Sequence, residues 1–254
     1  MLRRLLLLTL TLSALALPLC GQTVDELIAK NVQARGGLEK LKSVQSLRLT
    51  GKMTMGPGME APFTLEQKRP MLLRMEFTVQ GLTGVQAYDG TSGWQVMPFM
   101  GKKDPEVMTA DDLKEAEEQA DIDGPLVDYQ TKGHKVELLG KDKIEGTDAY
   151  KLKLTRKNGD IQTVYLDADS YLEIKDEGQR TVRGSVVETE TSLGDYKEVG
   201  GLMFPFSIES GIKGTEQKQK ITIDKVEFNV PLDEARFKMP APAPAPKPAE
   251  APKQ

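Results

Sequence analysis

The sequence predicts a mainly β protein: a large antiparallel coiled sheet, an incomplete β-barrel of about eleven strands, covered by an N-terminal helix and a short lid helix. Apolar and polar residues alternate through most of residues 46–230, turn signals separate the alternating segments, and helical periodicity is confined to two short stretches. Alternation with period two is typical of strands with one face on an apolar interior and one in water. So many consecutive strands should coil rather than stay flat.

Residues 1–21 predict a secretory signal peptide. Arg3 and Arg4 precede an apolar run that ends at Leu19, and its length of about 15 residues is short for a membrane span. Cleavage after Gly21 would release a periplasmic protein. In the less favoured alternative, Cys20 is acylated and anchors a lipoprotein; the residue before an acylated cysteine is normally small, and here it is Leu19.

Composition limits what the remaining chain can be. Cys20 is the only cysteine, so a protein cleaved after Gly21 has no disulfide and depends on its core for stability. The net charge of −4 becomes −6 when Arg3 and Arg4 leave with the signal peptide. An acidic body argues against nucleic acid as a partner and against adhesion to anionic lipid surfaces. Residues 22–239 suffice for one sizeable domain.

The first predicted element is a helix that begins after Thr23. Thr23 and Glu26 form a capping box, in which each side chain satisfies a free backbone N–H at the helix start. Gly36-Gly37 ends the helix. Its apolar residues recur at helical spacing, which predicts that one face packs across the sheet: Val24, Leu27, Ile28 and Val32.

Strands are predicted on both sides of a polar region at 99–131. The first group runs from 46 to 98, with breaks at Gly56-Pro57-Gly58, Arg69-Pro70 and Asp89-Gly90. The second group runs from 133 to 230 in nearly continuous hairpins. Between them, residues 109–121 predict a helix capped by Thr109 whose apolar stripe is thin, so we expect a cover or lid: Leu113, Ala116 and Ala120.

The C-terminal residues fall into two parts. Residues 233–237 predict one closing helical turn. Residues 240–254, PAPAPAPKPAEAPKQ, contain six prolines, which predict a disordered Pro/Ala-rich tail of extended conformation. An alternative role for this tail is a spacer that crosses cell-wall material or docks a partner.

No catalytic or metal site is predicted. His134 is the only histidine, and we expect it on an exposed loop rather than in a nucleophilic pair. With one histidine and no cysteine after Gly21, the usual zinc ligand sets are missing. No glycine-rich phosphate loop precedes a helix. We therefore expect no enzyme activity and no cofactor.

Methionine is concentrated in one region. Eight of the eleven methionines fall within residues 53–108, together with several aromatic residues. Methionine is flexible and polarizable and is over-used where a surface fits apolar ligands of variable shape. Thioethers also fill ordinary cores, so a plain structural role remains the competing interpretation.

Two motifs give the chain a resemblance to a known family. Residues 68–74, KRPMLLR, and 88–94, YDGTSGW, resemble the "RP…R" strand and "DG…W" hairpin of outer-membrane lipoprotein-sorting proteins of the LolA/LolB-like superfamily. Residues 223–233, IDKVEFNVPLD, with Phe237 and Pro240, also look like the last strand and closure of that family. The resemblance implies an incomplete barrel with helices acting as a lid over an apolar cavity, and no cofactor.

The resemblance also implies a set of ligand-binding residues and a function. The lid-closing arginine of the family would be Arg48 or Arg74. The function would be that of a periplasmic carrier for lipid or lipoprotein acyl chains. One alternative is an envelope lipid-sensing regulatory module that acts through a protein partner, and another is a structural domain whose interior is full. The residues expected to line the cavity are Met53, Met55, Leu65, Leu73, Met75, Phe77, Trp94 and Met97.

Overall fold

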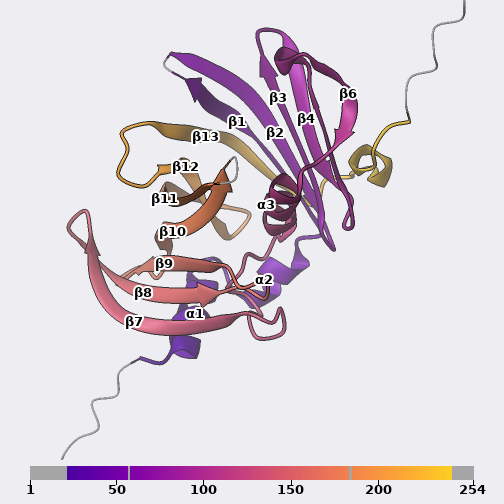
Figure 1. Ribbon diagram of the computed structural model, residues 1–254. Coiled ribbons are helices and arrows are strands. Elements are labelled where there is room, and N and C mark those ends of the chain that lie inside the picture. The colour runs from indigo at the N-terminus through magenta and orange to yellow at the C-terminus, as the bar shows by residue number, and fades with distance from the viewer. Residues whose placement is uncertain (1–21, 57, 183–184, 242–254) are drawn as a thin grey trace, which may run out of the picture.

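The computed structural model describes residues 22–56, 58–182 and 185–241, so the predicted signal peptide at 1–21 and most of the Pro/Ala-rich tail lie outside the described residues. Three α-helices, two short 3-10 helices and thirteen strands make up these ranges (Figure 1). In chain order they are α1 (Val24–Ala34), α2 (Leu38–Ser43), β1 (Ser46–Gly56), β2 (Met59–Lys68), β3 (Leu72–Val79), β4 (Leu82–Tyr88), β5 (Gly93–Met97), η1 (Pro98–Met100), β6 (Lys102–Val107), α3 (Ala110–Ala120), β7 (Lys135–Ile144), β8 (Thr147–Thr155), β9 (Ile161–Asp167), β10 (Glu173–Val182), β11 (Ser185–Val199), β12 (Leu202–Ile212), β13 (Lys218–Phe228) and η2 (Glu234–Phe237).

All thirteen strands belong to one antiparallel sheet that is strongly curved and not closed. Their order is β6-β5-β4-β3-β2-β1-β13-β12-β11-β10-β9-β8-β7, so the first and last strands of the chain pair in the middle of the sheet. β6 and β7 are the two free edges. The connection between them, residues 108–134, must therefore pass from one edge to the other, and it carries α3 across the open side of the curved sheet (Figure 1).

The predicted fold class is confirmed, with thirteen strands in place of about eleven. β6 (Lys102–Val107) is the strand that the sequence does not reveal. Its residues lack alternation, include Pro105, and are nearly all exposed, which suits an edge strand. α3 (Ala110–Ala120) and its Thr109 cap are found as predicted; the Thr109 hydroxyl accepts a hydrogen bond from the Asp112 N–H at 3.2 Å.

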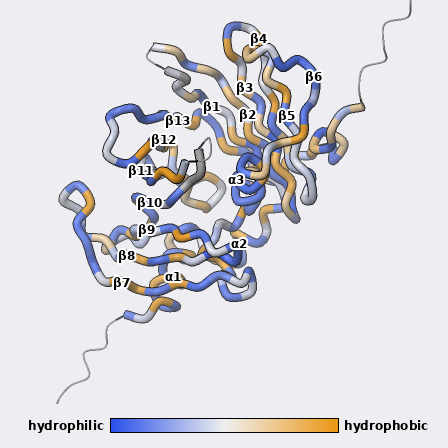
Figure 2. Tube along the Cα trace, in the orientation of Figure 1, coloured by the Kyte–Doolittle hydropathy of each residue, from blue (hydrophilic) through white to orange (hydrophobic). Residues whose placement is uncertain are grey.

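α1 starts as its sequence predicts. The Thr23 hydroxyl accepts from the Glu26 N–H, and the Glu26 carboxylate accepts from the Thr23 N–H at 2.9 Å. The apolar face of α1 buries Leu27 and Ile28 against β8 and β9. Figure 2 shows α3, by contrast, to be largely hydrophilic. No helix in the described ranges combines the length and apolar character that a bilayer-spanning segment requires.

The closing turn is also present and lies on the outer, convex face of the sheet. η2 buries Phe237 completely, and Phe237 packs with Leu72 and Leu232. The Phe237 carbonyl accepts a hydrogen bond from the Trp94 indole N–H at 2.9 Å. The end of the chain thereby covers the outer face of β3 and β5.

Candidate functional site

The concave face of the sheet forms a continuous apolar wall across its middle strands. The register places Leu65 of β2 opposite Met75 of β3, and Met53 of β1 opposite Ile221 of β13. Paired residues of antiparallel strands point to the same side, so these apolar side chains share one surface. The wall continues through Phe63 and Phe77, which are also cross-strand partners.

Most of the residues predicted for the cavity lie on this wall. Met53, Leu73, Phe77 and Met97 are buried, each less than 10% exposed. Two more are half-buried and pack against the same core, Leu65 and Met75. Met55 belongs to β1, but its side chain lies outside what the structure describes.

Trp94 lies on the opposite face, so the expectation that it shares the inner wall is wrong. It pairs with Ala87 of β4, which pairs in turn with Arg74 of β3. These residues alternate with the wall residues and point outward. Trp94 is buried there because η2 covers it, and its ring faces the Arg74 guanidinium at 5.6 Å. Its burial is therefore structural.

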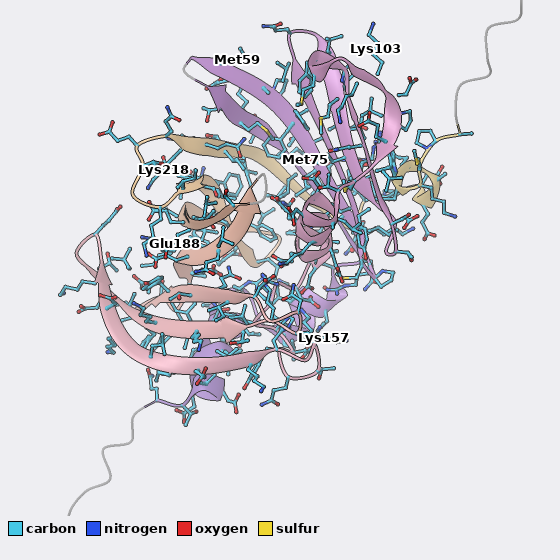
Figure 3. All side chains as sticks on the ribbon, in the orientation of Figure 1. Met59, Met75, Lys103, Lys157, Glu188 and Lys218 are labelled. Carbon is cyan, nitrogen blue, oxygen red and sulfur yellow. The ribbon has the colours of Figure 1, made fainter. Side chains whose placement is uncertain are left out.

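Helices and one loop fill the space over the wall in this conformation. Leu41 of α2 and Val127 of the loop after α3 pack into the wall's main cluster. Ala116 and Ala120 of α3 pack with Leu73 and Tyr88. The methionine cluster is therefore divided: Met75 lies within the wall, whereas Met59 is 41% exposed at the β1–β2 hairpin (Figure 3).

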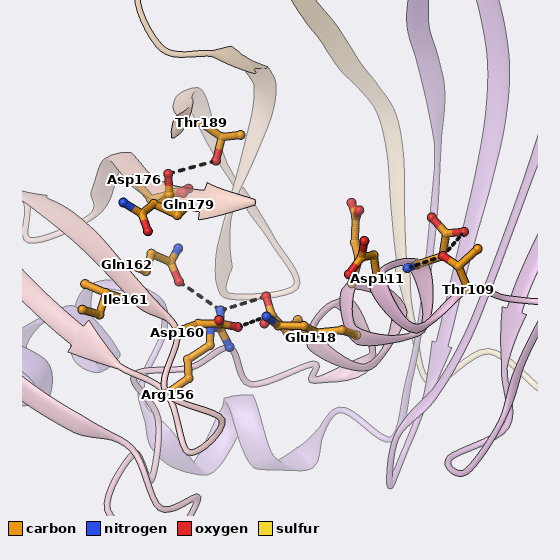
Figure 4. A pocket seen from close by; sticks show the side chains of 14 residues that line it. Thr109, Asp111, Glu118, Arg156, Asp160, Ile161, Gln162, Asp176, Gln179 and Thr189 are labelled. Atoms are coloured by element: carbon orange, nitrogen blue, oxygen red, sulfur yellow. Dashed lines mark hydrogen bonds and ion pairs between the residues drawn. The ribbon is translucent and has the colours of Figure 1, made fainter. Parts of the chain in front are cut away.

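Two ion pairs connect α3 to the β8–β9 hairpin on the other side of the curved sheet. Lys114 pairs with Asp160, and Glu118 pairs with Arg156 at 3.6 Å (Figure 4). Arg156 also donates to the Gln162 side-chain oxygen at 2.9 Å. α3 therefore joins the two halves of the sheet and covers the wall between them.

The segment after α3 is fixed by a buried carboxylate, Asp123. Arg69 donates to Asp123 Oδ2 at 3.0 Å and Lys42 donates to the same oxygen at 2.7 Å. Burial alone would raise the pKa of Asp123, but the hydrogen bonds from Arg69 and Lys42 outweigh it and lower the pKa to about 2. Asp123 therefore stays ionised and holds the C-terminal end of the lid against α2 and the end of β2.

Neither arginine that the resemblance offered for lid closure reaches α3. Arg48 pairs with Glu66 at 2.8 Å, and Arg74 pairs with Glu76 at 2.7 Å. Both arginines alternate with wall residues and lie on the outer face. The expectation for Arg48 or Arg74 is therefore wrong; Arg156 contacts the lid itself, and Arg69 contacts the segment that follows it.

A cavity of about 610 Å³ lies between α3 and strands β9–β11 (Figure 4). Its lining is mostly polar, unlike the wall. Sequence reasoning did not find it because its residues come from distant segments, and no linear pattern pairs residue 114 with residue 160. The lining consists of Thr109, Asp111, Asp112, Lys114, Glu115, Glu118, Arg156, Asp160, Ile161, Gln162, Asp176, Gly178, Gln179 and Thr189.

Glu173 shares a face of β10 with Asp176, which lines the cavity. The register pairs Glu173 with Leu166 and Asp176 with Val164, and those two partners of β9 point to one side. Glu173 is half-buried. Its pKa is raised to about 8, first by burial and then by the nearby charge of Asp176.

The remaining titratable candidate, His134, is half-buried rather than exposed. Its Nδ1 accepts a hydrogen bond from the Lys157 N–H at 3.1 Å, so it stabilises the loop before β7. Burial lowers the pKa of His134. Among the described residues, no group of three or more metal-ligating side chains is close enough to hold a metal ion.

The fold is similar to that of several solved structures, one of which is described as a LolA superfamily protein. A putative outer-membrane lipoprotein-sorting protein domain from Vibrio parahaemolyticus matches with a TM-score of 0.58 at 14% identity, covering 85% of this chain and 97% of that chain. A LolA superfamily protein from Nitrosomonas europaea matches with 0.58 at 13% identity, covering 86% and 98%. A DUF1329 family protein from Desulfovibrio piger matches with 0.59 at 13% identity, covering 85% and 97%.

In sequence, no family model and no curated protein matches the chain. At these identities the structural likeness establishes the fold alone. The fold class is therefore an incomplete LolA-like barrel, and its site combines an apolar wall, a covering helix and an adjoining polar cavity.

Proposed function

We propose that this protein is a periplasmic carrier that holds the acyl chains of a lipid or lipoprotein against the apolar wall after α3 moves away. The observation that carries the proposal is the contrast between the wall and its cover. The wall spans the middle strands of the sheet and carries a continuous cluster of apolar side chains. α3 covers part of it with little more than Leu113 and two alanines.

The free energy gained by burying an acyl chain exceeds the free energy needed to displace α3. Exposing the apolar contacts between α3 and Leu73 and Tyr88 costs about 5 kcal/mol at roughly 0.8 kcal/mol per methylene equivalent. The ion pairs of Lys114 and Arg156 add about 0.2–1 kcal/mol each. Burying an acyl chain of about sixteen carbons contributes roughly 12 kcal/mol of favourable free energy. A bound chain can therefore offset the opening of the lid.

Two further observations support the proposal. The chain begins with features of a secretory signal peptide, which agrees with an envelope location. The fold is that of a domain described as an outer-membrane lipoprotein-sorting protein. Fold alone does not determine function, so the wall and its cover remain the principal argument.

The test is native mass spectrometry of protein purified from its host envelope, followed by lipid extraction. Two substitutions on β3 form a matched pair: Met75→Asp places a charge on the wall, and Thr78→Asp places one on the opposite face. We expect acyl-bearing cargo on the wild type and on Thr78→Asp, and none on Met75→Asp. If all three proteins carry no acyl-bearing cargo, acyl carriage is refuted. A stoichiometric protein partner in place of lipid would favour the sensing module.

A further inference from the structure

A short helical turn, η1, places one aromatic ring on the apolar wall. η1 (Pro98–Met100) follows β5 and leads into the edge strand β6. Its middle residue, Phe99, is half-buried and packs against the wall's main cluster, whereas the next residue, Met100, is 68% exposed. The centroid of the Phe99 ring lies 5.5 Å from that of the Phe77 ring, with 55° between the two planes. η1 therefore contributes a ring to the inner face of the sheet.

The wall has a glycine beneath this ring. Gly84 lies inside β4, is buried, and pairs with Phe77 of β3. Its backbone does not have the left-handed conformation that requires glycine. A Cβ added at Gly84 would lie 2.8 Å from Phe99 Cε1 and 3.1 Å from Phe77 Cζ. A glycine inside a strand often marks the close approach of another group, and here that group is the Phe99 ring.

Phe99 adds to a row of rings that crosses the sheet. Phe77 pairs with Phe63 of β2, which pairs in turn with Gly51 of β1. A Cβ added at Gly51 would lie 2.9 Å from Phe63 Cε1, so a glycine stands at each end of the row. A phenyl ring is rigid, whereas a thioether such as that of Met75 adapts to irregular shapes. The row is therefore a firm boundary next to an adaptable part of the wall.

The row of rings lies beyond the part of the wall that α3 covers. Along the inner face of β3, Leu73 packs with α3 and Phe77 packs with Phe99. The half-buried Met75 lies between them. At about 3.3 Å per strand residue, Leu73 and Phe77 are roughly 13 Å apart. An acyl chain that enters where α3 moves away and follows β3 would therefore run over Met75 and end against the Phe99 ring.

We propose that Phe99 is a specificity-determining residue that closes the far end of the acyl-chain site and sets the longest chain that the wall holds. This inference rests on the proposed carrier function and adds selection of the cargo by chain length. Each methylene that reaches the wall increases affinity about fourfold. Methylenes beyond the Phe99 ring stay in water and add little, so removal of the ring should extend the site.

The test measures affinity against chain length. Saturated fatty acids of about ten to eighteen carbons, each below the concentration at which it aggregates, compete with a fluorescent fatty acid for the full-length protein. For the wild type, affinity should increase about fourfold per added methylene up to one chain length and then level off. In Phe99→Ala the plateau should begin about two to four carbons later, because burying a phenylalanine side chain is equivalent to burying about two to four methylenes.

Met100→Ala is the matched control, because it removes a large apolar side chain from the same helical turn but from an exposed position. Its plateau should begin at the wild-type chain length. Two further variants make the test independent of the folding of Phe99→Ala. Phe99→Leu fills part of the space and should shift the plateau less than Phe99→Ala, whereas Phe99→Trp adds a larger ring and should shift it to shorter chains. Circular dichroism checks that each variant is folded.

The outcomes distinguish the two proposals. If the plateau begins at the same chain length in the wild type and in the folded Phe99 variants, Phe99 does not limit the chain, and acyl carriage stands. An equal shift in Met100→Ala, or a wild-type affinity that increases through the longest chain, overturns the role of Phe99 in the same way. Failure of the wild type to bind any of the fatty acids refutes acyl carriage, and the role of Phe99 falls with it.

Discussion

Gly93 offers a direct way to move α3 without touching the apolar wall. It begins β5 and pairs with Tyr88 on the inner face. A Cβ added at Gly93 would lie 2.5 Å from Met108 Sδ and 3.0 Å from Leu113 Cδ1. Both atoms lie near the ends of flexible side chains, that of Leu113 in α3 and that of Met108 just before it. The backbone of Gly93 does not have the left-handed conformation that requires glycine. Gly93→Val should therefore keep the strand and push α3 outward.

The packing around Gly93 sets the expected change in stability and in ligand affinity. Overfilling a close-packed site costs about 1–3 kcal/mol, and α3 has only about 5 kcal/mol of apolar contact to lose. We expect Gly93→Val to lower the free energy of unfolding by about 1–3 kcal/mol. Opening of the lid then requires less energy, so affinity for a fluorescent fatty acid should rise, by about tenfold for each 1.4 kcal/mol.

Urea unfolding followed by circular dichroism gives the stability, and fluorescence titration gives the affinity. Gly194→Val is the control, because a Cβ at Gly194 meets no atom within 4 Å; it should change neither quantity appreciably. If Gly93→Val loses stability but its affinity is unchanged or weaker, α3 does not control access to the wall.

Three further predictions concern stability. Asp123→Asn should lower the free energy of unfolding by about 2–3 kcal/mol at pH 7. The pKa of Asp123 is about 2 in the folded protein and 3.8 in the unfolded chain, so the difference between variant and wild type in urea titrations should shrink as the pH falls toward 2. Glu173→Gln should have the same free energy of unfolding as the wild type at pH 4 and one about 2–4 kcal/mol higher at pH 9. The reason is that the pKa of Glu173 is about 8 in the folded protein, so its ionisation destabilises the wild type as the pH rises from 4.5 to 8. Equal urea midpoints of variant and wild type at pH 9 would contradict this. Phe237→Ala should cost about 3–5 kcal/mol and shift the emission of Trp94, the only tryptophan, to longer wavelength, and an unshifted spectrum would show that η2 does not cover Trp94.

Local signals predicted the elements well because their causes are local. The capping residues Thr23 and Thr109 marked both longer helices, and alternation marked the strands of the sheet. β6 was not predicted, because an exposed edge strand needs no alternation of apolar and polar residues. Trp94 was assigned to the wrong face because the turn at 89–92 sets the phase of β5, and the sequence alone does not give the number of residues in that turn.

The site was predicted only in its apolar part. Wall residues such as Leu65 and Met75 follow from strand periodicity. The polar cavity depends on the crossing of residues 108–134 from one sheet edge to the other, which brings Lys114 to Asp160 and Glu118 to Arg156. That crossing is a property of the whole topology, and no short-range pattern reveals it.

Photo-crosslinking with a diazirine-labelled palmitate tests the central claim most directly. The labelled chain is bound to the wild-type protein, irradiated, and located by peptide mass spectrometry. Adducts are expected on the inner-face residues of β2, β3 and β5, above all on the half-buried Leu65 and Met75. Adducts confined to the outer face around Arg48 and Glu66, or no adduct at all, would contradict an acyl-binding wall.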